Sequence, residues 1–396
     1  MKKIILSLVA LLAVSGTSVA QKAEQKVDTV KFTVVKENPI TSIKNQNRSG
    51  TCWNYSSLSF FEAELLRLGK GAYNLSESFV CQKTYMDRAD KTIRTHGDAS
   101  FAQGGSFYDV LYCLKNYGIV PEGILPYPIT CYGDSLYNFN EMWPMAEGIV
   151  NGIAKSDKKK INVHWRETLQ SVLDGYFGKV PASFEYKGKV YTPETFCKSL
   201  GLNLDDYVSL TSFSHQPQYG QFAIEVQDNW RWGLSYNLPL DEFMEVMESA
   251  VRNGYTFAWG ADVSETYFSR SNSVVQLPAK FRESGNAGSD AARWTGKNTT
   301  LTNQPVAETG EAAVTPEMRQ LAYDNWETTD DHGMVIYGLA KNPEGKEYFM
   351  VKNSWGEYGP YKGIFYVSKP YVAYKTLNIL INKNAIPKHI RKHLGL

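Results

Sequence analysis

The chain has 396 residues, 43% of them hydrophobic and 21% charged, which is enough for one large or two modest globular domains. Its formal net charge of +1 gives no reason to expect a general role in nucleic-acid binding. Beyond the N-terminus, no segment is apolar enough to cross a membrane.

Residues 1–20 have the order of a secretory signal. Lys2 and Lys3 precede a mainly apolar run over residues 4–14, and Ser18-Val19-Ala20 then places small residues where a signal peptidase reads. The alternative is a membrane anchor, but the run is shorter than the ~20 residues that a span needs. We therefore expect cleavage after Ala20 and an exported protein, periplasmic or secreted. The polar residues 21–37 predict a flexible lead-in.

The chain carries five cysteines, and export permits disulfides. Because the count is odd, at least one thiol has no intramolecular partner. The sequence has no CxxC and no Cys/His cluster at zinc spacing, so neither a metal site nor a cofactor is expected. The pairing of the other cysteines, including Cys113 with Cys131, stays open. The five are Cys52, Cys81, Cys113, Cys131 and Cys197.

Helices are predicted through the first two thirds of the chain. Residues 52–68 place apolar side chains three or four apart and are followed by Gly69, a good helix stop. Residues 75–80 resemble a capped helix start, and residues 104–120 a glycine turn followed by an amphipathic helix. Residues 239–255 predict a further helix. Helices and polar turns are expected in the segment from about 140 to 237, which carries no clear chemistry.

The C-terminal third changes to short runs rich in Val, Ile, Tyr and Phe, which predict strands. Residues 342–345 form a hairpin turn between the first two of these strands, and residues 284–310 look like a long surface loop. The expected class is therefore α+β, with helices before an antiparallel sheet and a cleft where the two halves meet.

Cys52 stands at a loop–helix junction rather than inside an apolar run. A helix N-terminus and a nearby imidazolium both favour a thiolate, which is the nucleophilic form of cysteine. Among six histidines, His332 begins a predicted strand, and Asn353 ends the return strand of the hairpin. The Asn353 amide could orient the imidazole of His332, and Trp355 could shield that hydrogen bond from water.

Three motifs together resemble the papain-type cysteine peptidases: Gln46 with Ser49-Gly50-Thr51-Cys52-Trp53, Asp331-His332-Gly333-Met334-Val335, and Lys352-Asn353-Ser354-Trp355-Gly356. The order Gln, Cys, His, Asn and the six-residue offset from Gln46 to Cys52 are similar to those of the family. Residues 236–265 and the motif RSGTCW resemble the bleomycin hydrolase and aminopeptidase C branch, which also has a large insertion, here at about 140–235. The peptidase domain would span residues 21–396.

The resemblance implies a two-lobed papain-like fold with a mainly helical insertion, and it implies peptide substrates. Cys52 would be the nucleophile and His332 the general base and acid, oriented by Asn353. Gln46 and the backbone N–H of Cys52 would form the oxyanion hole. Gly104 and Gly105 resemble the family's glycine pair, whose backbone binds substrate as an added strand. Trp355 would also contribute to substrate binding.

Three departures from the branch stand out. Ser49 occupies a position where secreted relatives usually carry a disulfide cysteine. The branch is usually cytosolic, and its chains end in an arm whose carboxylate lies in the cleft, whereas residues 384–396 here form a basic tail expected to be solvated. An aminopeptidase trimming N-termini is favoured, with an open-cleft endopeptidase or dipeptidyl-peptidase as the alternative. A catalytically silent peptide-binding protein is the third reading. Relatives often form hexamers, and the altered C-terminus leaves a homo-oligomer open.

Overall fold

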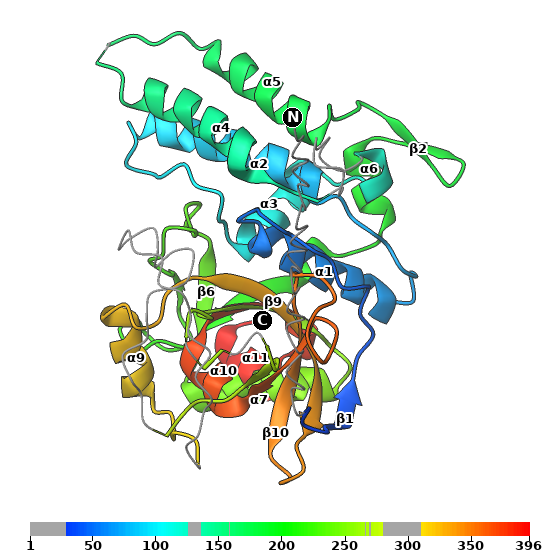
Figure 1. Ribbon diagram of the computed structural model, residues 1–396, viewed down its shortest axis with the longest axis vertical. Helices are drawn as coiled ribbons and strands as arrows, with labels where there is room; N and C mark the ends of the chain where they lie inside the picture. The colour runs from blue at the N-terminus through cyan, green and yellow to red at the C-terminus, as the bar shows by residue number, and fades with distance from the viewer. Residues whose placement is uncertain (1–28, 126–135, 158, 266, 269–270, 280–309) are drawn as a thin grey trace, which may run out of the picture.

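The computed structural model describes residues 29–125, 136–157, 159–265, 267–268, 271–279 and 310–396. The chain forms a mainly helical lobe above and a lobe built on a sheet below, with helix α1 (Cys52–Arg67) packed between them (Figure 1). The predicted α+β class and papain-like architecture are confirmed.

The helical lobe contains five helices and a small hairpin among the described residues. The helix predicted after the glycine turn at 104–120 is confirmed, and its first turn is closed by a capping box between Ser106 and Asp109. Ser76 caps the second helix by accepting a hydrogen bond from the backbone of Phe79 at 3.2 Å. The elements are α2 (Glu77–Arg94), α3 (Phe107–Asn116), α4 (Phe139–Ala154), α5 (Trp165–Phe177), β2 (Phe184–Tyr186), β3 (Lys189–Tyr191) and α6 (Pro193–Ser199).

The lower lobe is organised by a ten-stranded sheet of order β5-β6-β4-β12-β7-β9-β10-β11-β8, with β1 also pairing β9. All its pairs are antiparallel except β4 with β6 and β8 with β11. Its strands are β1 (Thr33–Glu37), β4 (Tyr207–Thr211), β5 (Gln221–Ala223), β6 (Leu234–Asn237), β7 (Phe257–Ala261), β8 (Val274–Val275), β9 (His332–Lys341), β10 (Glu347–Lys352), β11 (Ile364–Ser368) and β12 (Thr376–Asn382).

Two segments differ from expectation. Residues 33–37 were expected to belong to the flexible lead-in, but they form β1, which pairs with β9. The segment from about 140 to 237, expected to hold helices and turns, also supplies β4, β5 and β6. These strands are short and join the sheet through β12, where Leu210 pairs with Ile379. Such pairing over a long sequence separation leaves no local periodicity to read.

The sheet packs a helix on each face. Along β9 the side chain of Val335 joins the core that contains α1, whereas Met334 and Ile336 join the core that contains α7 (Leu240–Arg252). This alternation is the two-residue period of a strand buried on both faces. Because α1 packs on β9, the first residue of α1 and the first residue of β9 come to the same pocket.

The last third also contains α9 (Pro316–Asp324), α10 (Lys369–Lys375) and α11 (Lys388–Leu394), none of which was predicted. The expectation of a solvated tail is wrong, because α11 buries Ile390 and Leu394 in the core of the sheet lobe. His389 on α11 lies 3.5 Å from Glu245 on α7. The basic end of the chain is therefore held on the sheet lobe.

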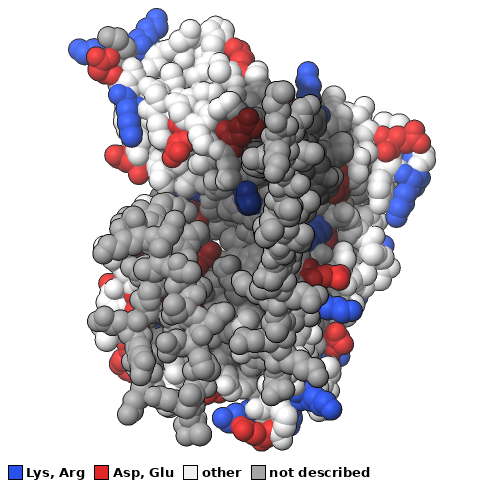
Figure 2. All heavy atoms as spheres, in the orientation of Figure 1, with Lys and Arg blue, Asp and Glu red and all other residues white. Residues whose placement is uncertain are grey.

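Charged side chains of both signs are interspersed on the face shown in Figure 2, as the net charge of +1 suggests. In the part of the chain that the structure describes, no helix is both long and apolar enough to span a bilayer. The predicted signal and nearly all of the predicted surface loop at 284–310 lie outside the described residues. Cys81, Cys113 and Cys197 are buried free thiols, and Cys131 is not described.

Candidate active site

Cys52 is the first residue of α1, so its backbone N–H has no preceding helical carbonyl to bond. The hydroxyl of Thr51, at the N-cap, pairs instead with the Ser49 hydroxyl at 2.6 Å and makes no cap bond to the helix. No acidic side chain lies in the first turn. The partial positive charge at this helix end is therefore left to act on the Cys52 sulfur.

The surroundings of the sulfur oppose ionisation more than the sequence suggested. Burial raises the pKa of the Cys52 thiol to about 12, and the carboxylates of Asp330 and Asp228 add to the rise. Hydrogen bonds from the backbone N–H groups of Gly333 and Trp53 act in the opposite direction. The thiol therefore depends on a neighbouring base, or on the positive charge that this base acquires, to become a nucleophile.

His332 is the base that lines the same pocket as Cys52. It is 5% exposed, and its Nε2 lies 2.8 Å from Oδ1 of Asn353. Oδ1 can only accept, and it also accepts from the backbone of Ser354 at 2.7 Å, so Nε2 of His332 carries the proton. The other ring nitrogen, Nδ1, is then the atom with a lone pair to receive a proton.

Trp355 covers the His332–Asn353 pair. Its ring stacks on the imidazole with centroids 4.6 Å apart and planes inclined by 27°. Asn353 is 1% exposed. A hydrogen bond excluded from water in this way is stronger than an exposed one, so the imidazole is held in one orientation.

Gln46 ties the loop before α1 to the loop after Asn353. Its backbone N–H donates to Ser354 O at 2.8 Å, and its side-chain Oε1 accepts from the Ser354 hydroxyl at 2.7 Å. Nε2 donates one N–H to Ser49 O at 2.9 Å, and an amide nitrogen has a second N–H to offer. The structure thus places Gln46 beside the two loops that carry Cys52 and Asn353.

The pocket between the lobes opens to solvent and has a cavity volume of about 50 Å³. Of the site residues predicted from the sequence, Cys52, His332 and Gly105 line it directly, and Gln46, Gly104, Asn353 and Trp355 do not. A Cβ on Gly105 would lie 2.9 Å from the Trp53 ring, so only glycine lets this backbone lie flat on the tryptophan. Asn353 and Trp355 support the pocket from behind His332.

Sequence reasoning missed several residues of the site. Ser49 was noted only as an absent cysteine, yet its hydroxyl donates to Gln46 O at 2.7 Å and holds the loop without a disulfide. Ser354 was part of a recognised motif but was given no role. Asp228, which lines the pocket, lies in a polar stretch of the insertion that gave no signal. Within the described ranges, no cluster of His, Cys, Asp or Glu is arranged to hold a metal ion.

Asp331, next to His332, belongs to a buried acidic pair. Burial and the nearby Asp262 carboxyl raise its pKa well above the ordinary value. Its Oδ2 accepts from the backbone N–H of Ser264 at 3.1 Å. These contacts hold the turn that leads into β9, whose first residue is His332.

Comparison with known proteins places this geometry among the peptidases. The model of the Peptidase C1-like family matches residues 2–278 and 312–395. Aminopeptidase G of Lactobacillus delbrueckii subsp. lactis is 22% identical over 89% of this chain and 83% of its own. Aminopeptidase C of Streptococcus thermophilus is also 22% identical, over 86% of this chain and 80% of its own.

Among solved structures, PepW from Lactobacillus rhamnosis matches with a TM-score of 0.67 and 22% identity. The match covers 92% of this chain and 84% of that protein. It supports the shared fold across both lobes, including most of the segment predicted as an insertion.

Proposed function

Since the chain belongs to the Peptidase C1-like family, we propose that it is an exported cysteine aminopeptidase that trims peptide N-termini through an acyl-enzyme. The observation that carries the chemistry is the pocket shared by Cys52 and His332, with Asn353 fixing the imidazole. The names of the relatives, all called aminopeptidases, support the choice of peptide end.

The proposed reaction has two halves, formation of a thioester on Cys52 and its hydrolysis. In the first, Nδ1 of His332 takes the Cys52 proton as Sγ bonds to the substrate carbonyl carbon, and the same proton then goes to the departing amine. In the second, His332 takes a proton from water, the hydroxide attacks the thioester, and Sγ leaves with that proton returning to it. Each half passes through an oxyanion, so a preorganised donor beside the carbonyl lowers both barriers.

Gln46 and the backbone N–H of Cys52 are the donors that we assign to that oxyanion. A side-chain amide in such a place is worth roughly 3–4 kcal/mol of transition-state stabilisation. Gln46 suits this role because Ser49 and Ser354 hold its amide on both sides. It therefore needs little reorganisation when charge develops on the substrate.

The peptide end that the enzyme reads is tested with a matched pair of fluorogenic peptide amides, one with a free amine and one acetylated. We expect the free-amine peptide to be cleaved at least about 100-fold more efficiently, because an aminopeptidase site must bind the α-ammonium that acetylation removes. Equal cleavage of the two, or internal cleavage of long proteins, would establish an endopeptidase on the same scaffold. Release of dipeptides would establish the dipeptidyl-peptidase alternative.

The export part of the proposal rests on the basic, apolar and small-residue order of residues 1–20. We expect protein purified from the native cell envelope or medium to begin at Gln21. N-terminal sequencing checks this directly. Soluble protein that still begins with Met1 would contradict export without touching the assignment of the catalytic chemistry.

A further inference from the structure

Residues 388–396 do not line the pocket that holds Cys52. In the described part of the chain, the residues lining the Cys52 pocket include none from α11 or beyond. The tail is held elsewhere, since His393 stacks edge-on against Tyr219 with ring centroids 5.0 Å apart. An aminopeptidase nevertheless needs a negative group close to the scissile bond. Another part of the chain must provide it.

A ten-residue segment, residues 224–233, leaves the sheet lobe, contacts the helical lobe at this pocket and returns to the sheet, and we call it the strap. It connects β5 to β6, and Ile224, Val226, Asp228 and Asn229 of the strap line the pocket together with Cys52 and His332.

The strap is fastened to the helical lobe by buried charge. Arg231 reaches Asp87 on α2 at 2.5 Å and Asp109 on α3 at 2.7 Å. Its guanidinium also stacks over the ring of Tyr112 at 4.0 Å. The backbone carbonyl of Trp230 accepts a hydrogen bond from Lys91 on α2. Contacts from Arg231 to two different helices hold this segment in place against the helical lobe.

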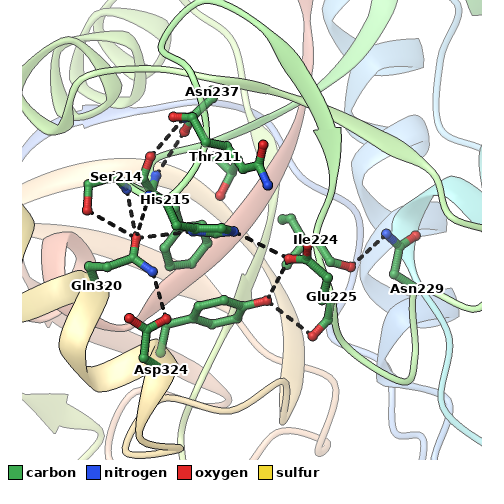
Figure 3. Close-up of polar contacts among 12 residues, drawn as sticks. Thr211, Ser214, His215, Ile224, Glu225, Asn229, Asn237, Gln320 and Asp324 are labelled. Atoms are coloured by element: carbon green, nitrogen blue, oxygen red, sulfur yellow. Dashed lines mark hydrogen bonds and ion pairs between the residues drawn. The ribbon is translucent and has the colours of Figure 1, made fainter.

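The same strap is fastened to the sheet lobe by the contacts in Figure 3. Tyr323 on α9 donates to Glu225 O at 3.1 Å, and Nε2 of His215 lies 3.4 Å from the Glu225 carboxylate. Within the strap, the Asn229 amide donates to Ile224 O at 3.1 Å (Figure 3). It also donates to Gly233 O at 3.1 Å. The strap therefore closes on itself and is held from both sides of the cleft.

Asp228 lies where the strap meets the glycine pair. A Cβ on Gly104 would be 1.7 Å from Oδ2 of Asp228, so the carboxylate rests directly against the Gly104 backbone. Arg88, which is fully buried, holds both partners: it donates to Gly104 O and lies 3.6 Å from Oδ1 of Asp228. At 3.6 Å the contact with Asp228 is one of charge rather than a hydrogen bond.

The lining of the pocket is acidic. Of the residues described there, the charged ones are Asp228, Asp330 and Asp331, and none is Lys or Arg. Asp331 is engaged with Asp262 and the backbone of residues 263 and 264. Asp228 contacts Arg88 and the Gly104 backbone while also lining the pocket, and Asp228 and Asp330 are both close enough to influence the Cys52 thiol.

We propose that the strap forms the closed end of the substrate cleft and that Asp228 binds the α-ammonium of the peptide N-terminus. This inference rests on the proposed aminopeptidase activity and names the residue that gives it its preference. Because Asp228 touches Gly104, next to the backbone of Gly105 in the pocket, it lies where the first residues of an extended peptide would end. The strap then leaves no path for a longer chain.

The test is a thermodynamic cycle that removes the Asp228 charge from the enzyme and the α-amine from the substrate, separately and together. An alanyl fluorogenic amide and its desamino analogue, the propionyl amide, are compared on the wild type, Asp228→Asn and Asp330→Asn. We expect Asp228→Asn to lower kcat/KM for the alanyl amide roughly 30- to 1,000-fold, mainly through KM, whereas the propionyl amide, which has no ammonium for Asp228 to bind, should show no such loss. The wild type should prefer the alanyl amide, and Asp228→Asn should treat both alike.

Two outcomes overturn the inference while leaving the proposed function in place: Asp228→Asn keeps the wild-type preference, or the preference is lost in Asp330→Asn instead. A wild type with no free-amine preference overturns both together. Thermal unfolding checks each variant, since Asp228→Asn leaves Arg88 with one fewer negative neighbour. If that variant does not fold, Asp228→Glu retains the charge but displaces it. It should lower kcat/KM for the alanyl amide alone, and an unchanged value would contradict the assignment.

Discussion

Replacement of Cys52 by alanine is expected to abolish peptide hydrolysis, lowering kcat on the order of 10⁵- to 10⁶-fold. Loss of Sγ removes the only thiol among the described residues that line the pocket, and the backbone of α1 is unaffected because alanine is a good helix former. Turnover of a free-amine fluorogenic amide measures the loss. Covalent labelling by an electrophilic peptide probe, read by mass spectrometry, should disappear with it.

A matched control is available in Cys197→Ala. Cys197 is also a free thiol, buried on α6 with its sulfur 3.5 Å from Leu114 O, and it does not line the pocket. We expect this variant to keep turnover within about twofold and to keep the label. Retained amide hydrolysis by pure Cys52→Ala protein would exclude the thioester mechanism. A label that survives in that variant would place the reactive thiol elsewhere.

His332→Ala is expected to lose nearly as much activity, about 10⁴-fold or more at pH 7, because the nucleophile and its base act as a unit. With the Cys52 pKa near 12, set by burial and two carboxylates, the thiolate fraction at pH 7 without the imidazole would be roughly 10⁻⁵.

The pH dependence of kcat/KM in the His332→Ala variant tests the role of His332 more specifically. Below the pKa of the thiol, the thiolate fraction rises tenfold with each pH unit, so the residual kcat/KM of His332→Ala should climb about tenfold per unit between pH 7 and 10. The wild type should show no such climb. His389→Ala, on α11 at the surface, is the control and should match the wild type. A flat profile for His332→Ala, or more than about 1% residual activity at pH 7, would remove His332 from the mechanism.

The hydrophobic pattern of the sequence predicted those helices and strands in which its periodicity is uninterrupted. The helices at α1, α3 and α7 each show one apolar face, and the strands β9 and β10 are rich in β-branched and aromatic residues around a clear turn. Cys52, His332, Asn353 and Gln46 were found because each lies in a short motif. Their mutual placement could be expected only through the family resemblance, since 280 residues separate Cys52 from His332.

The strap could not be predicted, because nothing local marks it. Asp228 comes to Gly104 only when β4 pairs with β12, which joins residues about 170 positions apart, and when Arg231 finds Asp87 and Asp109 on two different helices. The C-terminal helix is a different case. Ile390 and Leu394 have helical spacing, and Gly395 adopts the left-handed conformation of a helix end, so the signal was present but was outweighed by the surrounding basic charge.

The fastening of the strap to both lobes has a consequence for the order in which products leave. With one end of the cleft closed, the shortened peptide must depart through the open end before water reaches the thioester, and the released N-terminal residue must follow by the same route. The next peptide cannot enter until that residue has gone. Trimming is then distributive rather than processive: a long peptide should pass through a ladder of singly shortened intermediates in free solution, and free amino acids should compete with substrate for the pocket.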